Sequence, residues 1–196
     1  MIAEIAQVVV DYVASWGYIG IFFLMLLESS FIPFPSEIVL IPAGYLASQG
    51  EMSLWLIMLF AMVGSMAGAI INYYLAKSLG RRFLIKFGHY VFIKPSTLDK
   101  MDNYFLKHGH ISTFIGRLLP GVRQLISIPA GIAKMGMKLF LTYTALGAVI
   151  WSSILVALGY FIGENKELLA QYLHQITVGV VVSVIVLVLW YYKKNR

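Results

Sequence analysis

The chain has 196 residues, of which 60% are hydrophobic and 14% aromatic but only 12% charged. An ordinary soluble domain carries about 25% charged residues, so this composition excludes a typical water-soluble protein. Cysteine is absent, which rules out a disulfide framework, a thiolate metal site and a cysteine nucleophile.

The charges are distributed very unevenly along the chain, although their sum is only +6. Residues 1–76 contain acidic residues and no basic one, whereas all 15 basic residues lie in 77–196. Basic loops of membrane proteins stay in the cytoplasm, so the basic segment 77–107 is expected on that side. Basic residues interleaved with aromatic ones can also indicate nucleic-acid binding, but the apolar surroundings favour a membrane surface, and we expect no nucleic-acid partner.

The first apolar segment, 12–50, does not have the pattern of one spanning helix. It is uncharged apart from Glu28 and Glu37, and three prolines interrupt it, namely Pro33, Pro35 and Pro42. Broken backbone is tolerated at membrane depth only when it is buried in protein or lines a wet cavity. We therefore expect a re-entrant hairpin over 12–50, broken at these prolines. In an alternative that stays open, residues 12–32 form a complete span and place the N-terminus inside.

The next two segments predict a transmembrane helix and a cytoplasmic connection. Residues 52–76 contain no charge and, as a helix, would reach roughly 37 Å, which exceeds a hydrocarbon core of about 30 Å. Segment 77–107 combines basic residues with aromatic residues at helical spacing, which predicts short amphipathic helices on the inner leaflet. Ser96 and Asp99 have the spacing of a capping box, so a helix is expected to begin after Pro95.

The second half of the chain repeats this order. Segment 108–133 is apolar but contains Arg117 and Arg123, with the helix breakers Pro120, Gly121 and Pro129. It predicts a second re-entrant hairpin. Residues 139–163 and 168–192 are again free of charge and are predicted to span the membrane.

An internal repeat relates the two hairpins. Residues 33–44 and 120–131 each start with proline and end in Pro-Ala-Gly after the same number of residues, and a Gly-Ala-x-Ile run follows each at 68–71 and 147–150.

With 77–107 inside, the span at 52–76 runs inward and the span at 139–163 runs outward. The sequence therefore predicts an all-α integral membrane protein of two inverted repeats. Each repeat is a re-entrant hairpin plus a transmembrane helix, with cytoplasmic amphipathic helices between them, an extra C-terminal transmembrane helix and a cytoplasmic C-terminus. Such repeats are typical of secondary transporters, with the binding site at the repeat interface.

Four charged residues in the two hairpins form the candidate site: Glu28, Glu37, Arg117 and Arg123. A charge at the bilayer centre costs about 2.5 to 3.5 kcal/mol on insertion scales, so each requires a partner or a function. Two guanidinium groups suit a phosphate, which they bind through planar, bidentate contacts. Carboxyl groups in apolar surroundings suit proton coupling or gating, although a nearby arginine opposes protonation. The alternative is that these residues only form Glu–Arg pairs that hold the hairpins together.

Other functions receive less support from the residues. No nucleophile elbow, phosphate-binding P-loop or zinc-protease motif occurs, so we expect a transporter rather than an enzyme, with no cofactor and no metal. Two further classes of protein stay open, an ion or proton transporter and a structural membrane protein. A homo-oligomer is also possible from the sequence. Trp151 is interpreted as a belt or packing residue, whereas Asn72 is expected either to line a polar cavity or to lie at the interface.

The paired motifs closely resemble those of the DedA family of bacterial membrane proteins, also called the VTT or SNARE-associated domain family. The resemblance rests on Leu-Glu at 27–28, Pro-x-Pro-Ser-Glu at 33–37, Gly-Arg at 80–81 and Gly-Arg-x-x-Pro-x-x-Arg at 116–123, with Pro-Ala-Gly at 42–44 and 129–131. It covers residues 16–163. Many relatives carry Pro-Gly-Asp where this chain has Pro-Ser-Glu, which places it nearer the Pro-Ser-Glu branch.

The resemblance implies lipid translocation across the bacterial inner membrane. Family members are associated with recycling of the carrier lipid undecaprenyl phosphate, with phosphatidylethanolamine distribution, with phospholipid scrambling and with dependence on proton motive force. It also implies that Glu28, Glu37, Arg117 and Arg123 fall on the acidic and basic positions that the family requires. The expected partners are therefore protons and a membrane lipid with a phosphate headgroup, either a polyprenyl phosphate or a phospholipid.

Overall fold

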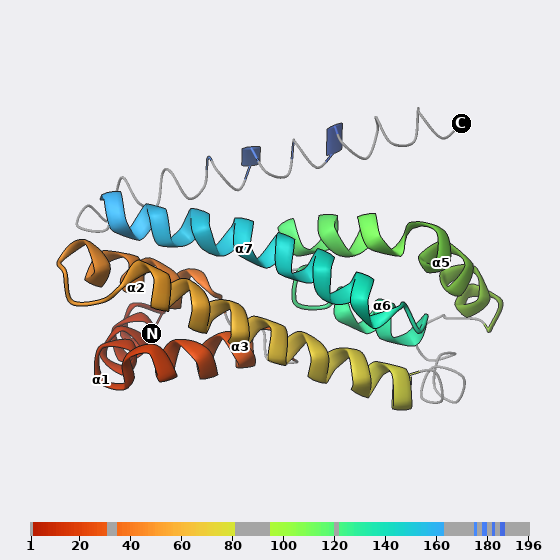
Figure 1. The fold of residues 1–196 in the computed structure, drawn as a ribbon, viewed down its shortest axis with the longest axis horizontal. Helices are drawn as coiled ribbons and strands as arrows, with labels where there is room; N and C mark the ends of the chain where they lie inside the picture. The colour runs from red at the N-terminus through yellow and green to blue at the C-terminus, as the bar shows by residue number, and fades with distance from the viewer. Residues whose placement is uncertain are drawn as a thin grey trace.

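The computed structural model describes residues 2–30, 35–80, 95–119 and 122–162, with a few isolated positions between 175 and 186 (Figure 1). Its elements are α1 (Ile2–Glu28), α2 (Glu37–Ser48), α3 (Leu54–Leu75), the π-helical turn η1 (Ala76–Gly80), α5 (Pro95–Leu118), α6 (Ser127–Ile132) and α7 (Met137–Ile162). The described residues form helices and connections and contain no strand, which confirms the predicted all-α class for this part of the chain. The predicted helix at 168–192 lies almost entirely outside the described residues.

Two helices are long and apolar enough to cross a membrane. They are Leu54–Gly80, with mean hydropathy 2.2, and Met137–Ile162, with mean hydropathy 2.0. Each keeps large apolar side chains partly exposed along its length, including Leu59, Val63 and Leu146. Apolar surface of this kind suits contact with lipid tails rather than with water.

The first hairpin segment contains α1 and α2, and residues 31–34 between them lie outside the described residues. Within α1, Gly17 takes φ 56° and ψ −135°, a conformation that glycine adopts without a Cβ clash, and the helix bends there. The expectation that Pro42 breaks a helix is wrong, because Pro42 lies inside α2. In the second turn of a helix, its ring removes one backbone hydrogen bond and the helix continues. Pro35 precedes α2, and Pro33 lies outside the described residues.

The second hairpin segment is built differently. α5 begins at Pro95, close to the predicted start after this residue, and runs without a break to Leu118. The predicted boundary between 107 and 108 therefore falls inside one helix. The expectation that Pro129 breaks a helix is also wrong, because it lies in the first turn of α6. Backbone N–H groups in a first turn have no intrahelical acceptor, so proline is tolerated there. Pro120, Gly121 and residues 81–94 lie outside the described residues.

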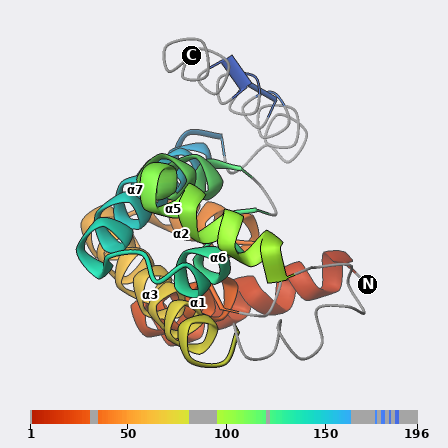
Figure 2. The same ribbon diagram turned by 90° about the vertical axis from the view of Figure 1, so that its right-hand side faces the viewer.

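The helices pack in a reciprocal arrangement. α1 packs on α3 and α5 on α7, whereas the short helices cross over, α2 packing on α7 and α6 on α3. Figure 2 shows α5 and α7 on one side of the bundle, α1 and α3 on the other, and α6 between them. Glycines allow the close contacts. A Cβ on Gly44 or Gly159 would overlap backbone of α7 or α2 respectively, and one on Gly131 would overlap the Tyr73 carbonyl of α3.

Two hydrophobic cores lie along the bundle, with polar residues between them. One core contains Ile57 and Ala61 of α3 and Leu155 of α7, and the other contains Ala69 of α3 and Phe140 of α7. Ser65 and Thr144 are buried on the same two helices between these cores. In this polar layer, Ser65 lies near mid-length of α3, and Thr144 lies in the first third of α7.

Candidate functional site

The two hairpin segments meet at Arg123. Its Nη2 atom lies 3.1 Å from Oε1 of Glu28 and 3.4 Å from Oε1 of Glu37. Glu28 is the last residue of α1 and Glu37 the first of α2, so one guanidinium joins both ends of the first hairpin turn. The Arg123 and Glu28 side chains are 8% and 4% exposed, and that of Glu37 is 22% exposed. Three of the four predicted site residues thus form one ion-paired cluster.

Arg117 has a different environment. It lies in the last turn of α5 and is 3% exposed, and its Nη2 donates a hydrogen bond to Ser127 Oγ at 3.0 Å. Among the described residues, no carboxylate lies within ion-pair distance of this guanidinium, and its Nε has no hydrogen-bond partner. Leaving a buried charge without an opposite charge is unfavourable. The two glutamates and two arginines balance in charge, but both carboxylates contact Arg123, so Arg117 is the arginine without a direct ion pair.

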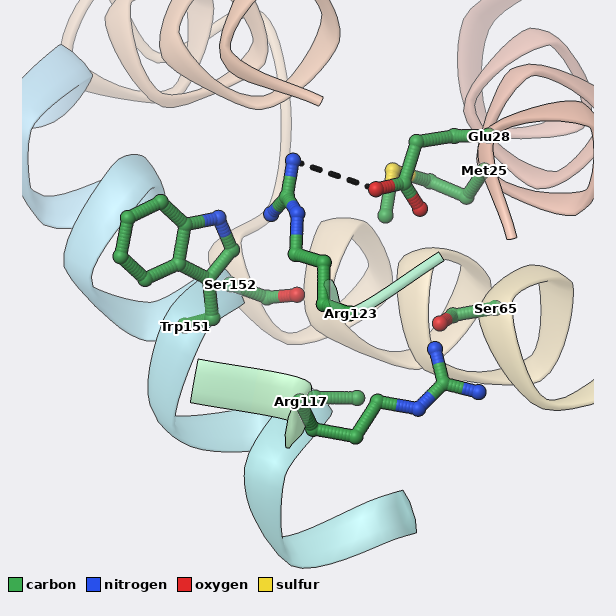
Figure 3. A pocket seen from close by; sticks show the side chains of 8 residues that line it. Met25, Glu28, Ser65, Arg117, Arg123, Trp151 and Ser152 are labelled. Atoms are coloured by element: carbon green, nitrogen blue, oxygen red, sulfur yellow. Dashed lines mark ion pairs between the residues drawn. The ribbon is translucent and has the colours of Figure 1, made fainter. Parts of the chain in front are cut away.

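A small cavity separates the two arginines (Figure 3). Its volume is about 20 Å³, which is room for about one water molecule. The lining residues come from both halves of the chain: Met25, Glu28, Ser65, Arg117, Arg123, Ala148, Trp151 and Ser152. Met25 and Trp151 belong to the first hydrophobic core, and Ser65 belongs to the polar layer, so the cavity lies where the two adjoin.

The cavity wall carries hydrogen-bond donors that lack acceptors. Arg117 Nε, Arg123 Nε and Trp151 Nε1 are all buried without a partner. The nearest carboxyl group, that of Glu28, already contacts Arg123 and accepts a hydrogen bond from Ser29 Oγ at 3.0 Å. Buried polar groups in native proteins are nearly always paired. A ligand that supplies acceptor oxygens, such as a phosphate, would match these donors.

Sequence reasoning missed the role of Trp151, which it interpreted as a belt or packing residue. The side chain is 3% exposed on α7, and the Arg123 Cζ atom lies 5.0 Å from its ring centroid. This distance is within the range of a cation–π contact. An aromatic residue in an apolar span gives no signal of such a contact, because the contact depends on which helix packs opposite.

Asn72, expected either to line a polar cavity or to lie at the interface, is fully buried and is not among the residues that line the cavity. Its Nδ2 donates to the Ser29 carbonyl at 3.0 Å and to the Gln124 carbonyl at 3.5 Å. Each acceptor is one residue beyond a member of the Glu28–Arg123 pair. Ser29 Oγ also lies 2.7 Å from Ser65 Oγ, so α3 fixes the end of α1 through two side chains.

Fold and site together define an all-helical membrane protein with a charged cavity buried between two helical hairpin segments. The chain matches the VTT domain over residues 34–161. It is 40% identical to the uncharacterized membrane protein YkoX of Bacillus subtilis over 97% of this chain and 84% of the relative. It is 32% identical to undecaprenyl phosphate transporter A of Bacillus subtilis, over 96% and 93%, and 26% identical to protein DedA of Escherichia coli, over 91% and 83%. No solved structure matches the chain. The chain belongs to the VTT domain family, the DedA family of membrane proteins, which confirms the resemblance found in the sequence.

Proposed function

We propose that this protein is a lipid translocase that moves undecaprenyl phosphate between the leaflets of the bacterial inner membrane and so recycles the carrier lipid. Arg117 and Arg123 bind the phosphate, and Glu28 and Glu37 gate the site. The observation that carries the proposal is the burial of Arg117 beside the cavity without a carboxylate partner among the described residues. The charges of the two glutamates and two arginines sum to zero, but both carboxylates contact Arg123. A phosphate group would give the Arg117 guanidinium a direct ionic partner with acceptor oxygens.

Two relatives, each named undecaprenyl phosphate transporter A, support the same substrate class. A protein named undecaprenyl phosphate transporter A is 32% identical to this chain and matches nearly all of it. A polyprenyl phosphate carries one terminal phosphate on an apolar tail, so its only strongly polar part needs a buried site. A pair of arginines in a small cavity is sufficient for such a headgroup.

The ion pairs suggest how the site opens. In the conformation described, Arg123 contacts both glutamates and the cavity holds about one water, so a phosphate enters only when the Arg123 contacts rearrange. Protonation of Glu28 or Glu37 removes the negative charge that competes with phosphate for Arg123. Proton uptake therefore favours phosphate binding, and proton release favours its expulsion.

We also propose the membrane arrangement predicted from the sequence, with re-entrant hairpins at 12–50 and 108–133 and inverted repeats. The reciprocal packing supports it, because Gly44 and Gly131, the matched glycines of the two Pro-Ala-Gly motifs, each contact the long helix of the other repeat. The remaining segments are spans at 52–76, 139–163 and 168–192 and a cytoplasmic segment at 77–107. This arrangement places the cavity near the bilayer midplane.

Liposomes containing the purified protein test the proposal. Undecaprenyl phosphate that reaches the outer leaflet is measured with an added phosphatase, and a phosphatidylethanolamine probe is followed in parallel. The account expects selective movement of undecaprenyl phosphate, reduced at least about tenfold by Arg117→Gln, since hydrogen bonds to charged groups contribute about 1.5–3 kcal/mol. Lys138→Gln, at an exposed position of α7, is the matched control. Equal movement of both lipids indicates a scramblase, and lipid-independent proton flux indicates an ion transporter.

A further inference from the structure

The indole of Trp151 is buried, but its N–H group has no hydrogen-bond acceptor. In Figure 3 the indole nitrogen lies on the edge of the ring nearest the Arg123 guanidinium. The ring itself contacts Arg123, whose Cζ atom lies 5.0 Å from the ring centroid. Trp151 Nε1 and Arg123 Nε, on two residues that line the cavity, therefore both lack an acceptor.

This arrangement distinguishes Trp151 from an ordinary packing residue. Buried tryptophan usually finds a partner for its N–H group, because an unsatisfied buried donor loses its bonds to water. The hydroxyl groups of Ser65 and Ser152 also line the cavity, yet neither accepts from the indole. The donor is therefore available to a ligand that occupies the cavity.

Resting on the proposed function, we infer that Trp151 Nε1 is a third donor to the bound phosphate, beside the guanidinium groups of Arg117 and Arg123. A terminal phosphate monoester has three unesterified oxygens, one for each donor group, whereas a phosphodiester has two. Trp151 also orients Arg123 through the face of its ring. It is thus a specificity-determining residue that favours monoester headgroups over ordinary phospholipids.

The test is the indole ¹⁵N–¹H spectrum of tryptophan-labelled protein in detergent micelles. The chain has four tryptophans, and the Trp151 signal is assigned by elimination with Trp16→Phe, Trp55→Phe and Trp190→Phe, so the assignment does not require a cavity variant. The probe is farnesyl phosphate, a short polyprenyl monoester. Inorganic phosphate and farnesol are added separately, to distinguish the headgroup from the tail.

Saturating farnesyl phosphate is expected to move the Trp151 N–H signal downfield and to leave that of Trp55, which is 85% exposed, in place. If inorganic phosphate produces the same shift, the phosphate group enters the cavity without a lipid tail. If only farnesyl phosphate produces the shift, the phosphate must be attached to a lipid. Both results support the inference. An equal shift with farnesol would overturn it, because the signal would then report the tail.

Binding measurements on variants complete the test. Trp151→Phe keeps an aromatic ring without the N–H group and is expected to weaken farnesyl phosphate binding about tenfold, whereas Trp55→Phe leaves it unchanged. Farnesyl phosphate that binds in an Arg117-dependent manner without moving the Trp151 signal refutes the role of Trp151 and leaves the proposed function standing. Failure of the unmodified protein to bind farnesyl phosphate would refute both.

Discussion

Glu28 Oε1 lies 3.1 Å from Arg123 Nη2, and this ion pair joins the end of α1 to the turn that precedes α6. The two residues are far apart in the sequence and belong to different hairpin segments. Because both side chains are almost fully buried, the pair is shielded from water, and removing either partner leaves an uncompensated charge. The closed form of the cavity therefore depends on this contact.

Removing Glu28 is expected to destabilise the protein more than removing Glu37. Glu28→Ala leaves Arg123 with the more exposed of its two partners and should lower the free energy of unfolding by about 3 kcal/mol, the lower end of the range for a broken buried pair. The Glu37 side chain is 22% exposed, so we expect Glu37→Ala to cost about 1 kcal/mol, as for a weakly buried pair. Reversible unfolding in mixed micelles measures both. Glu51→Ala, at an exposed position, should leave the free energy unchanged, and a larger loss for Glu37→Ala than for Glu28→Ala would contradict this account.

Substitutions of the two arginines are expected to differ in their effect on the free energy of unfolding, although both abolish or lower transport. Arg117→Met removes a guanidinium that has no carboxylate within ion-pair distance among the described residues, but it leaves the two glutamates with one arginine. The free energy of unfolding should therefore fall, by less than for Arg123→Met. Translocation of undecaprenyl phosphate should nevertheless be lost. Arg123→Met leaves Glu28 and Glu37 without their shared cation and should lower both stability and transport. Equal destabilisation by the two substitutions would show that Arg117 has a structural partner.

Asn72→Leu is expected to loosen the two hairpin turns relative to each other. The substitution removes the donor to the Ser29 and Gln124 carbonyls, which are then buried without that bond, at a cost of about 1–3 kcal/mol. The chain has no cysteine, so spin labels at Ser30→Cys and Leu125→Cys report the distance between the turns directly. We expect a broader distance distribution in Asn72→Leu. Tyr74→Leu, two residues further along α3 at an exposed position, should keep the narrow distribution. An unchanged distribution width in both variants would show that Asn72 does not fix the distance between the turns.

Close packing of α2 on α7 should make Gly159 intolerant of alanine. A Cβ there would overlap the Ile41 backbone, and backbone gives way less readily than a side chain, so Gly159→Ala should cost about 3 kcal/mol or more. A Cβ on Gly136 meets no atom within 4 Å, and Gly136→Ala should be neutral or slightly stabilising. Thermal unfolding of the two variants in the same detergent compares them. A neutral Gly159→Ala variant would contradict the contact between these helices.

Much of the site could be predicted because charges inside a membrane leave few options. Glu28, Glu37, Arg117 and Arg123 lie in apolar surroundings between helix breakers, and such charges either pair or serve a function. The sequence could not predict that both glutamates contact Arg123, because this depends on how the two hairpin segments pack in three dimensions.

The missed features depend on tertiary packing. Pro42 lies in the second turn of α2 and Pro129 in the first turn of α6. Proline is tolerated in a first turn, but the sequence does not show where these short helices begin. The contacts of Trp151 and Asn72 with the charged residues and their neighbours depend on how α7 and α3 pack against the hairpin segments, which the sequence does not show. The family resemblance, by contrast, rests on short motifs in a fixed order, which can be recognised from the sequence without a structure.

The most direct test of the central claim is the distance between the lipid phosphorus and the arginine guanidinium nitrogens, measured by ³¹P–¹⁵N rotational-echo double resonance in proteoliposomes with ¹⁵N-arginine protein and undecaprenyl phosphate. The monoester phosphorus is resolved from the phospholipid diesters by its chemical shift. Our account predicts dephasing of guanidinium nitrogens by this phosphorus, lost when Arg117 and Arg123 are both replaced by lysine. Bound undecaprenyl phosphate without dephasing, or dephasing that persists in the double variant, would contradict the account.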